Sequence, residues 1–198
     1  MAARKQLPLP KGIRGSGVVT ASPDGKTLAY EDDGSTIRLV DAATGAERRT
    51  LEIKDCSYTQ LLFSPDGRRL AGGGTKGDKV HVAVWDLRSG DVLCRWQWPK
   101  GRDPHSHVEC LSFTPDGSRL AAAMFRQSSA RVWDIDKNRE IAHLPHAEIY
   151  GLSFSPDGRT LATAGWDCRL RFWDPDTAKA RREFEVTDMK DQNADNRM

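Results

Sequence analysis

Short apolar segments alternate with polar turns along the chain, and within the segments apolar residues recur at every second position. Leu152-Ser153-Phe154 and Leu170-Arg171-Phe172-Trp173 show this period, which predicts half-buried β-strands. Pro156-Asp157-Gly158 predicts a hairpin turn, because it supplies a fixed φ, a side-chain acceptor and a residue that tolerates positive φ. With one strand returning from this turn and a fourth over 180–186, the segment is predicted to be a four-stranded antiparallel meander.

The same pattern occurs four times along the chain. Tetrapeptides of the form Ser/Thr-Pro-Asp-Gly begin at residues 22, 64, 114 and 155, Leu-Ala pairs at 28, 70, 120 and 161, and Val-Asp or Trp-Asp pairs at 40, 85, 133 and 173. A constant order at a spacing of roughly 40 to 50 residues is the signature of a repeat architecture. The predicted units cover 17–51, 58–98, 107–144 and 147–186. Residues 1–16 are predicted to be an N-terminal tail and residues 187–198 a polar C-terminal tail.

A single four-stranded meander cannot bury both of its faces, so each unit must stack against its neighbours. The Trp-Asp pairs and the repeat length resemble the WD-repeat β-propeller family, and the resemblance covers residues 17–186. It implies an all-β fold of four four-stranded antiparallel blades. Since rings of this family usually close with about seven blades, it also implies an incomplete ring as a single chain.

The fourth repeat matches the family most fully. By the resemblance, His146, Thr163, Asp167 and Trp173 form a buried hydrogen-bond network that fixes two turns to the sheet. The other repeats depart from this set. Ala122 takes the hydroxyl position in the third repeat, Gly72 takes it in the second, and Val40 replaces the tryptophan in the first.

The resemblance also implies that the loops joining second to third strands, and fourth strands to the next blade, share one rim that binds partner proteins. Those loops carry Tyr58, Lys76, Trp98, Lys100, Arg102, Phe125, Arg126, Ile149 and Trp166. Aromatic and arginine side chains are the usual hot spots of protein interfaces. Core packing is the expected role of Trp98 and Ile149, whereas Trp166, just before the turn Asp167, is expected to project outward.

Charge and composition limit the classes of binding partner that we expect. Among 198 residues, 30 Lys and Arg face 28 Asp and Glu, and a net charge of +2 gives no strong field toward nucleic acid or an anionic membrane. The paired arginines at 48–49, 68–69 and 181–182 are predicted to be solvated. The N-terminal segment has no long apolar run and the 4 cysteines have no C-x-x-C spacing. We therefore expect a cytoplasmic protein with buried or incidental thiols.

Three groups of residues resemble a catalytic, a metal-binding or a phosphate-binding site. For each we favour a structural interpretation. His146, Asp167 and Thr163 suggest a hydrolase triad, but the threonine lacks an activating neighbour. His105, His107 and Cys110 lack a fourth ligand for zinc. Gly72-Gly73-Gly74 precedes no helix that could cradle phosphate, and is predicted to be a flexible strand end. No catalytic residue, metal or cofactor is expected.

Two hypotheses for function remain. The first is a non-enzymatic scaffold whose rim binds a protein or peptide. The second is a propeller fragment or regulatory lid of a larger or split enzyme or signalling protein, and Ser22 to Tyr30 also resembles repeats of periplasmic translocation-associated propellers. An open ring predicts completion by another propeller chain, two copies forming an eight-bladed ring, or a tight four-bladed closure.

Overall fold

Sixteen β-strands make up the ordered elements of the computed structural model, which describes residues 17–32, 35–53, 56–100, 105–125, 127 and 129–186. The tails predicted at 1–16 and 187–198 lie outside the described residues. All regular elements in the described ranges are strands. Within the same ranges, no helix has the length and apolar character needed to cross a membrane.

The strands form four antiparallel sheets, here called blades 1 to 4, each following chain order. Blade 1 contains β1 (Val19–Ala21), β2 (Thr27–Asp32), β3 (Thr36–Asp41) and β4 (Glu47–Glu52). Blade 2 contains β5 (Ser57–Phe63), β6 (Arg69–Lys76), β7 (Lys79–Asp86) and β8 (Val92–Pro99). Blade 3 contains β9 (Val108–Phe113), β10 (Arg119–Met124), β11 (Ser129–Asp134) and β12 (Arg139–Pro145). Blade 4 contains β13 (Ile149–Phe154), β14 (Leu161–Gly165), β15 (Arg169–Trp173) and β16 (Ala180–Glu185).

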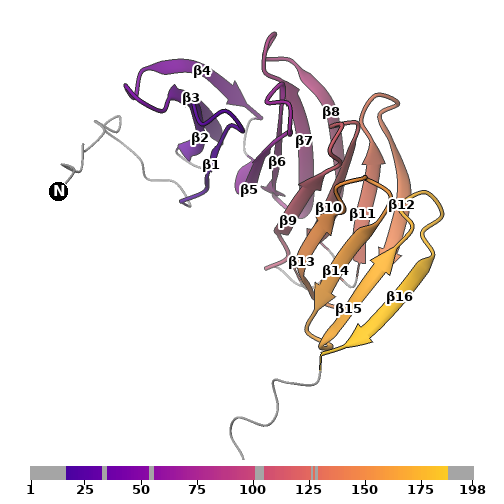
Figure 1. Ribbon diagram of the computed structural model, residues 1–198. Coiled ribbons are helices and arrows are strands. Elements are labelled where there is room, and N and C mark those ends of the chain that lie inside the picture. Colours follow the sequence, from indigo (N-terminus) through magenta and orange to yellow (C-terminus); the bar gives the residue numbers. More distant parts are fainter. Residues whose placement is uncertain are drawn as a thin grey trace, which may run out of the picture.

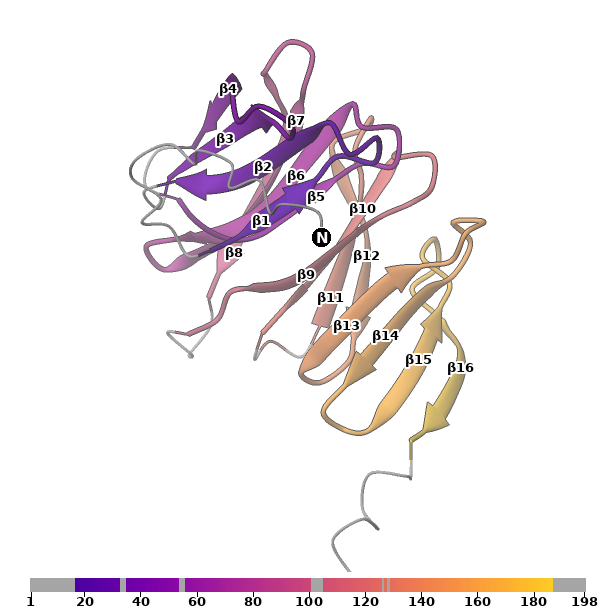
Figure 2. The same ribbon diagram turned by 60° about the vertical axis from the view of Figure 1, so that its left-hand side comes forward.

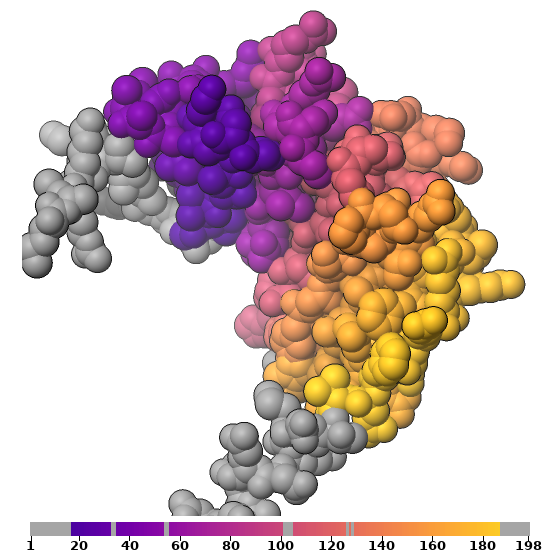
Figure 3. Space-filling view, in the orientation of Figure 1, coloured from indigo at the N-terminus to yellow at the C-terminus, as the bar shows by residue number. Residues whose placement is uncertain are grey.

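The blades stand side by side in chain order around an open arc (Figures 1 and 2). Their first strands are neighbours, because β1 contacts β5, β5 contacts β9 and β9 contacts β13. The space-filling view shows blades 1 and 4 apart, at opposite ends of a crescent (Figure 3). The prediction of an all-β propeller of four blades that does not close is confirmed, and the alternative of a tight four-bladed closure is wrong for this chain.

Three separate hydrophobic clusters hold the arc together, one at each junction between consecutive blades. Trp85, Trp133 and Trp173 each lie in the cluster shared with the preceding blade. In blade 3, which has neighbours on both sides, β10 is buried from Leu120 to Met124. In β16 at the end of the arc, every residue is exposed. Burial therefore depends on having a blade on each face, as the repeat predicted.

The Ser/Thr-Pro-Asp-Gly hairpins share one set of local hydrogen bonds. In the first, the Ser22 hydroxyl donates to Asp24 at 2.6 Å, the backbone N–H of Thr27 donates to Ser22 at 2.9 Å, and Gly25 has a φ of 70°. The hairpins of consecutive blades also touch, since a Cβ placed on Gly67 would lie 3.7 Å from Pro23. The motif thus closes each hairpin and aligns it with the next.

The run Gly72-Gly73-Gly74 corrects a prediction. It lies inside β6, fully buried, and is not a flexible strand end. A Cβ on Gly73 would lie 2.5 Å from a methyl of Val108 in blade 3, and one on Gly74 would lie 2.1 Å from the carbonyl oxygen of Ser57. Glycine is required here because neighbouring chain segments approach too closely for any side chain.

A β-bulge recurs near the start of the first strand in blades 2, 3 and 4. The register shifts between Tyr58 and Gln60, and between Ile149 and Gly151, at corresponding positions. A bulge adds one residue and reverses the alternation of side chains. Tyr58 and Ile149 consequently point into the core, while the inserted residue, Tyr150 in blade 4, is turned to the surface.

The 4 cysteines are free thiols in different environments, with Cys56 and Cys94 buried, Cys110 partly buried and Cys168 exposed. Burial raises the pKa of Cys56 and Cys94 to about 11 and that of Cys110 to about 12. A raised pKa keeps the thiol protonated and unreactive in mildly alkaline buffer.

We therefore expect iodoacetamide to label Cys168 alone in the native protein, and all 4 cysteines in denaturant. Peptide mapping by mass spectrometry measures the labelled sites. A Cys168→Ser variant is the control and should be almost unlabelled when native. Comparable labelling of Cys94 in the native state would contradict the buried junction between blades 2 and 3.

Candidate functional site

The candidate site is the rim formed by the loops on one edge of the four sheets. In an antiparallel meander, the loop between the second and third strands lies on the same edge as the connection to the next blade. The rim therefore includes the β6–β7, β10–β11 and β14–β15 turns and the segments linking β8 to β9 and β12 to β13.

Trp166 is the most exposed large apolar side chain of the described residues, with 69% of its surface accessible. It occupies the β14–β15 turn, where its backbone N–H donates to the carbonyl of Glu148 at 3.1 Å. Its ring lies against Tyr150, with ring centroids 5.3 Å apart and planes inclined by 31°. The two side chains form an exposed aromatic pair, held by a turn on one side and a bulge on the other.

Asp167 points the opposite way, into a buried polar network. Its carboxylate lies 3.0 Å from His146 Nε2, and His146 Nδ1 lies 2.7 Å from the Thr163 hydroxyl. The indole N–H of Trp173 donates to the same hydroxyl at 2.8 Å. With the proton on Nε2, His146 donates to Asp167 and accepts from Thr163. Each of these hydrogen-bonding groups in the network therefore has a partner. The structure brings all four predicted residues together.

Charge extends this network toward the outer strand. Arg171 Nη1 lies 2.8 Å from Asp167, and Arg171 Nε lies 2.6 Å from Glu183 on β16. Burial opposes ionisation of Asp167, but hydrogen bonds from His146 and Arg171 outweigh it and hold the pKa of this carboxyl below its usual value. The network therefore fixes the turn that carries Trp166.

The same geometry gives His146, Thr163 and Asp167 a structural role. The His146 side chain is fully buried and the Thr163 hydroxyl already accepts from Trp173, so neither faces a space where a substrate could bind. His107 is engaged with the carbonyl of His105 and with Glu109. No cluster of three or more His, Cys, Asp or Glu side chains among the described residues could hold a metal ion.

The other predicted rim residues lie in different environments. Tyr58 is a correction: only 1% of it is accessible, and it packs edge-on against Trp85 at 5.9 Å because of the bulge in β5. Lys76 is partly buried, and Phe125 stacks on His107 at 5.0 Å. Arg102 and Arg126 lie outside the described residues.

Ile149 belongs to the core, and Trp98 is partly buried and packs against a core cluster. Ile149 has no accessible surface, and Trp98 stacks on Trp133 with centroids 5.6 Å apart. The indole N–H of Trp98 donates to the side chain of Gln127 at 3.3 Å.

A polar groove of about 440 Å³ opens on the rim near blades 2 and 3. Its lining includes Thr59, Lys100, His107 and Glu109. Thr59 and Glu109 are the bulge residues of β5 and β9, at the position that Tyr150 has in β13. The bulges, which no alternation pattern indicates, thus supply one rim side chain in each of three blades.

Sequence reasoning missed Tyr150 and a set of arginines that join blades. Arg49 donates to the carbonyls of Arg88 and Ser89, and Arg69 forms an ion pair with Asp136 at 2.8 Å. The only signal for these contacts is that the arginine and its acceptor recur at fixed positions in successive repeats. Two of the arginine pairs predicted to be solvated therefore contribute to blade junctions.

Comparison with known proteins agrees with this fold and rim. The family model "WD domain, G-beta repeat" matches residues 100–134 and 138–174. The chain is 30% identical over 121 residues to Protein groucho of Drosophila melanogaster, which covers 60% of this chain and 15% of that protein. It is 32% identical over 105 residues to WD repeat-containing protein 82 of Drosophila melanogaster, covering 52% of this chain and 31% of that protein.

A third relative is WD repeat-containing protein SL1-17 of Schistosoma mansoni, which is 27% identical over 122 residues, or 61% of this chain and 37% of that protein. The matched regions thus span 15% to 37% of the length of these relatives.

Proposed function

We propose that this chain, a member of the WD-repeat family, is a non-enzymatic scaffold that binds another protein or a peptide through its rim loops. The observation that carries the proposal is the exposed pair of Trp166 and Tyr150. Large aromatic side chains held in one conformation lose little entropy on binding and are enriched in interface hot spots.

Rigidity of the rim supports this proposal. Gly165 precedes Trp166, and a Cβ at this position would lie 2.5 Å from the carbonyl of Ala147 and 2.6 Å from His146 Nε2. The turn is thus packed directly on the buried network and presents Trp166 in a fixed place. A preorganised surface binds with a smaller ordering cost than a flexible one.

The rim also offers polar contacts beside the aromatic pair. Lys100, His107 and Glu109 line the 440 Å³ groove, which carries both signs of charge. A peptide with mixed polar and apolar side chains matches this combination better than a uniformly charged polymer does. We propose no nucleic-acid or membrane partner and no cofactor.

Trp166→Ala is expected to weaken partner binding by about 30-fold, the equivalent of a hot spot worth about 2 kcal/mol. Stability should change by no more than about 0.5 kcal/mol, because the side chain is exposed. The measurement is quantitative mass spectrometry of proteins captured from cell lysate by the tagged chain, followed by titration of the enriched partner.

Leu93→Ala is the matched control, since Leu93 is an exposed apolar residue on β8 with 40% accessible surface and is not in a rim loop. The proposal requires that Trp166→Ala and Tyr150→Ala lose the same partner while Leu93→Ala retains it. A partner captured equally by all three variants would exclude this part of the rim.

We further propose that the protein acts in a reducing compartment such as the cytoplasm. Support comes from 4 free cysteines, of which Cys56 and Cys94 are packed in blade junctions where no disulfide partner is near. Fractionation of cells that express the tagged chain tests this. Recovery from the periplasm or the medium would contradict it.

A further inference from the structure

Blade 4 has an open outward face that repeats the face by which blades 1 to 3 hold the next blade. Four apolar residues of blade 4 correspond by β-sheet register to four junction residues of blade 1. The pairs are Leu170 with Ile37, Phe172 with Leu39, Phe184 with Leu51, and Val186 with Ile53. Leu51 and Ile53 are 2% and 3% accessible, whereas Phe184 and Val186 are 52% and 50% accessible. Among the described residues, no blade covers this junction surface of blade 4.

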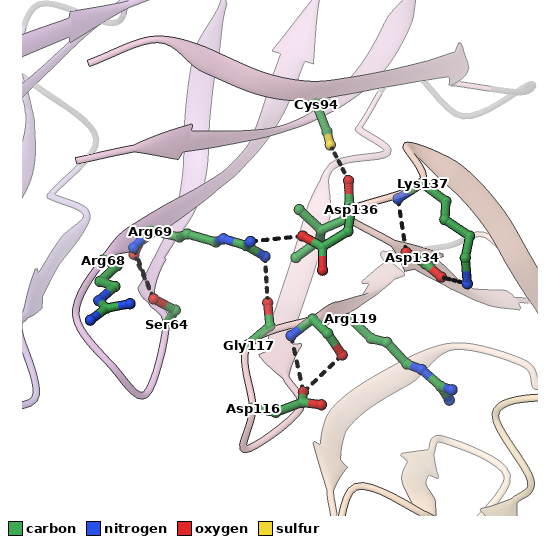
Figure 4. A network of polar contacts seen from close by, with 12 residues as sticks. Ser64, Arg68, Arg69, Cys94, Asp116, Gly117, Arg119, Asp134, Asp136 and Lys137 are labelled. Carbon is green, nitrogen blue, oxygen red and sulfur yellow. Dashed lines mark hydrogen bonds and ion pairs between the residues drawn. The ribbon is translucent and has the colours of Figure 1, made fainter. Parts of the chain in front are cut away.

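The junctions inside the chain use two kinds of polar clamp. In the first kind, an arginine after the hairpin reaches an aspartate in the β-turn that follows the Trp-Asp pair of the next blade. Arg69 lies 2.8 Å from Asp136 and donates to the Gly117 carbonyl at 2.9 Å (Figure 4). Arg119 lies 2.8 Å from Asp176 in the same way. This clamp joins blade 2 to blade 3 and blade 3 to blade 4.

The second kind joins blade 1 to blade 2. Arg48 binds within its own blade, to the Thr27 hydroxyl at 2.8 Å and to Asp41 at 2.6 Å. The adjacent Arg49 reaches across and donates to the carbonyls of Arg88 and Ser89 in the turn of blade 2. The receiving turn has no aspartate at the position of Asp136, because Arg88 stands there.

The receiving turn of this second clamp also ends in glycine. A Cβ on Gly90 would lie 2.0 Å from Arg49 Nη1, so a side chain there would displace the guanidinium. The turns that receive the first clamp end in Asn138 and Ala178, which adopt the same left-handed conformation with φ of 47° and 57°. Glycine at this position is thus associated with a guanidinium lying over the turn.

Blade 4 carries the second kind of clamp. Arg181 binds Thr160 at 3.3 Å and Asp174 at 2.7 Å, as Arg48 binds Thr27 and Asp41. The adjacent Arg182 pairs in register with Phe172, as Arg49 pairs with Leu39, and is exposed. A groove of about 310 Å³ on blade 4 is lined by Thr160, Phe172, Arg181, Arg182 and Phe184. Their counterparts Thr27, Leu39, Arg48 and Arg49 line blade 1's side of the 720 Å³ cleft to blade 2.

The incoming blade can be identified from its turn. The turn of the incoming blade must lack an aspartate at the Asp136 position. It must also have a glycine at its end. In this chain only the turns of blades 1 and 2 meet both conditions, and the turn of blade 2 is already occupied by Arg49. The turn of blade 1 has Ala43 and Gly45 at these positions, with a φ of 74° at Gly45.

Blades 1 and 4 also differ from the other blades in the size of the residues at two junction positions. At the internal junctions, the next blade inserts a tryptophan next to a small or branched residue such as Leu39, Val84 or Val132. Blade 1 has Val40, which is 3% accessible, in place of that tryptophan, and blade 4 has the larger Phe172 in place of the branched residue. Val19 of blade 1 occupies the position that Leu61 has in blade 2, on the sheet face turned away from the next blade. Val19 is 62% accessible.

We propose that blade 4 of one copy receives blade 1 of a second copy, with Arg182 on the turn carbonyls at 43–44 and Phe184 against the Val19 face. With a twofold axis, blade 4 of each copy contacts blade 1 of the other copy. Two chains therefore close a single ring of eight blades. The inference goes beyond the proposed binding role of the rim and does not depend on it.

The test is the mass of the purified full chain in solution, measured by light scattering after size exclusion. We expect twice the chain mass of 22.0 kDa. Phe184→Asp and Val19→Asp should each reduce it to the single-chain mass, and Arg182→Ala should raise the dissociation constant at least about tenfold. Glu185→Lys, next to Phe184 on the opposite face of β16, is the control and should keep the double mass. Circular dichroism verifies that each variant is folded.

Mixing the two charge variants separates this junction from other dimers. The Val19→Asp chain keeps a working blade 4 and the Phe184→Asp chain keeps a working blade 1, so an equal mixture should regain the double mass at high concentration. A single-chain mass for the unmodified protein would overturn the proposal. So would a dimer sensitive only to Phe184→Asp, which would join two copies of blade 4, or a series of larger masses, which would indicate open filaments.

Discussion

Replacing Gly74 with alanine is expected to lower the free energy of unfolding by about 3 kcal/mol, because the added methyl group cannot be accommodated in the core. The new Cβ would lie 2.1 Å from the carbonyl oxygen of Ser57 and 2.8 Å from the Cα of Tyr58. Both atoms belong to the backbone of β5, so no side chain can rotate away. Urea unfolding followed by tryptophan fluorescence measures the change.

Gly151→Ala is the matched control on blade 4. The nearest atom to its new Cβ would be the Cβ of Ala164 at 3.6 Å, an ordinary van der Waals contact, and its φ is not positive. Its stability should stay within about 0.5 kcal/mol of the unmodified chain. Equal losses at the two positions would show that the loss at Gly74 does not come from the close approach of β5.

Thr163→Val is expected to cost about 3 kcal/mol, since it removes the hydroxyl that joins His146 to Trp173 while keeping the side-chain volume. The indole N–H of Trp173 and the Nδ1 of His146 would then be buried without partners. Each unsatisfied buried group costs about 1 to 3 kcal/mol. The urea midpoint should fall with an unchanged dependence on denaturant.

Thr163→Ser provides the control, because serine keeps the hydroxyl and loses one methyl group. It should cost about 1 kcal/mol. If the valine and serine variants were equally stable, the hydrogen bonds of Thr163 would contribute nothing, and the network would owe its rigidity to packing alone.

Local features of the fold could be predicted because each depends on residues close in sequence. Pro156-Asp157-Gly158 determines its hairpin through its own φ preferences and side-chain acceptor. The network of His146, Thr163, Asp167 and Trp173 also lies within one repeat. The hairpin and the network of blade 4 could therefore be predicted from the residues of one repeat.

The errors share a different cause, which is that contacts across strands and blades override the local pattern. Gly72-Gly73-Gly74 resembles a loose segment until β5 and Val108 are placed against it. Tyr58 has the alternation of a surface residue, and the bulge at Thr59 turns it inward. Arg49 and Arg69 look solvated because their acceptors lie 39 to 67 positions further along the chain.

Because the three core clusters each join only consecutive blades, the fold itself sets no blade number. Blade 3 carries both halves of one clamp, Arg119 toward the next blade and Asp136 toward the preceding one. A gene duplication that repeats this blade would therefore preserve the polar clamp at the new junction and lengthen the arc. Blades 1 and 4, by contrast, have no such freedom if they close the ring together. If blades 1 and 4 close the ring with a second copy, a duplication that keeps their junction must lie in the middle of the chain.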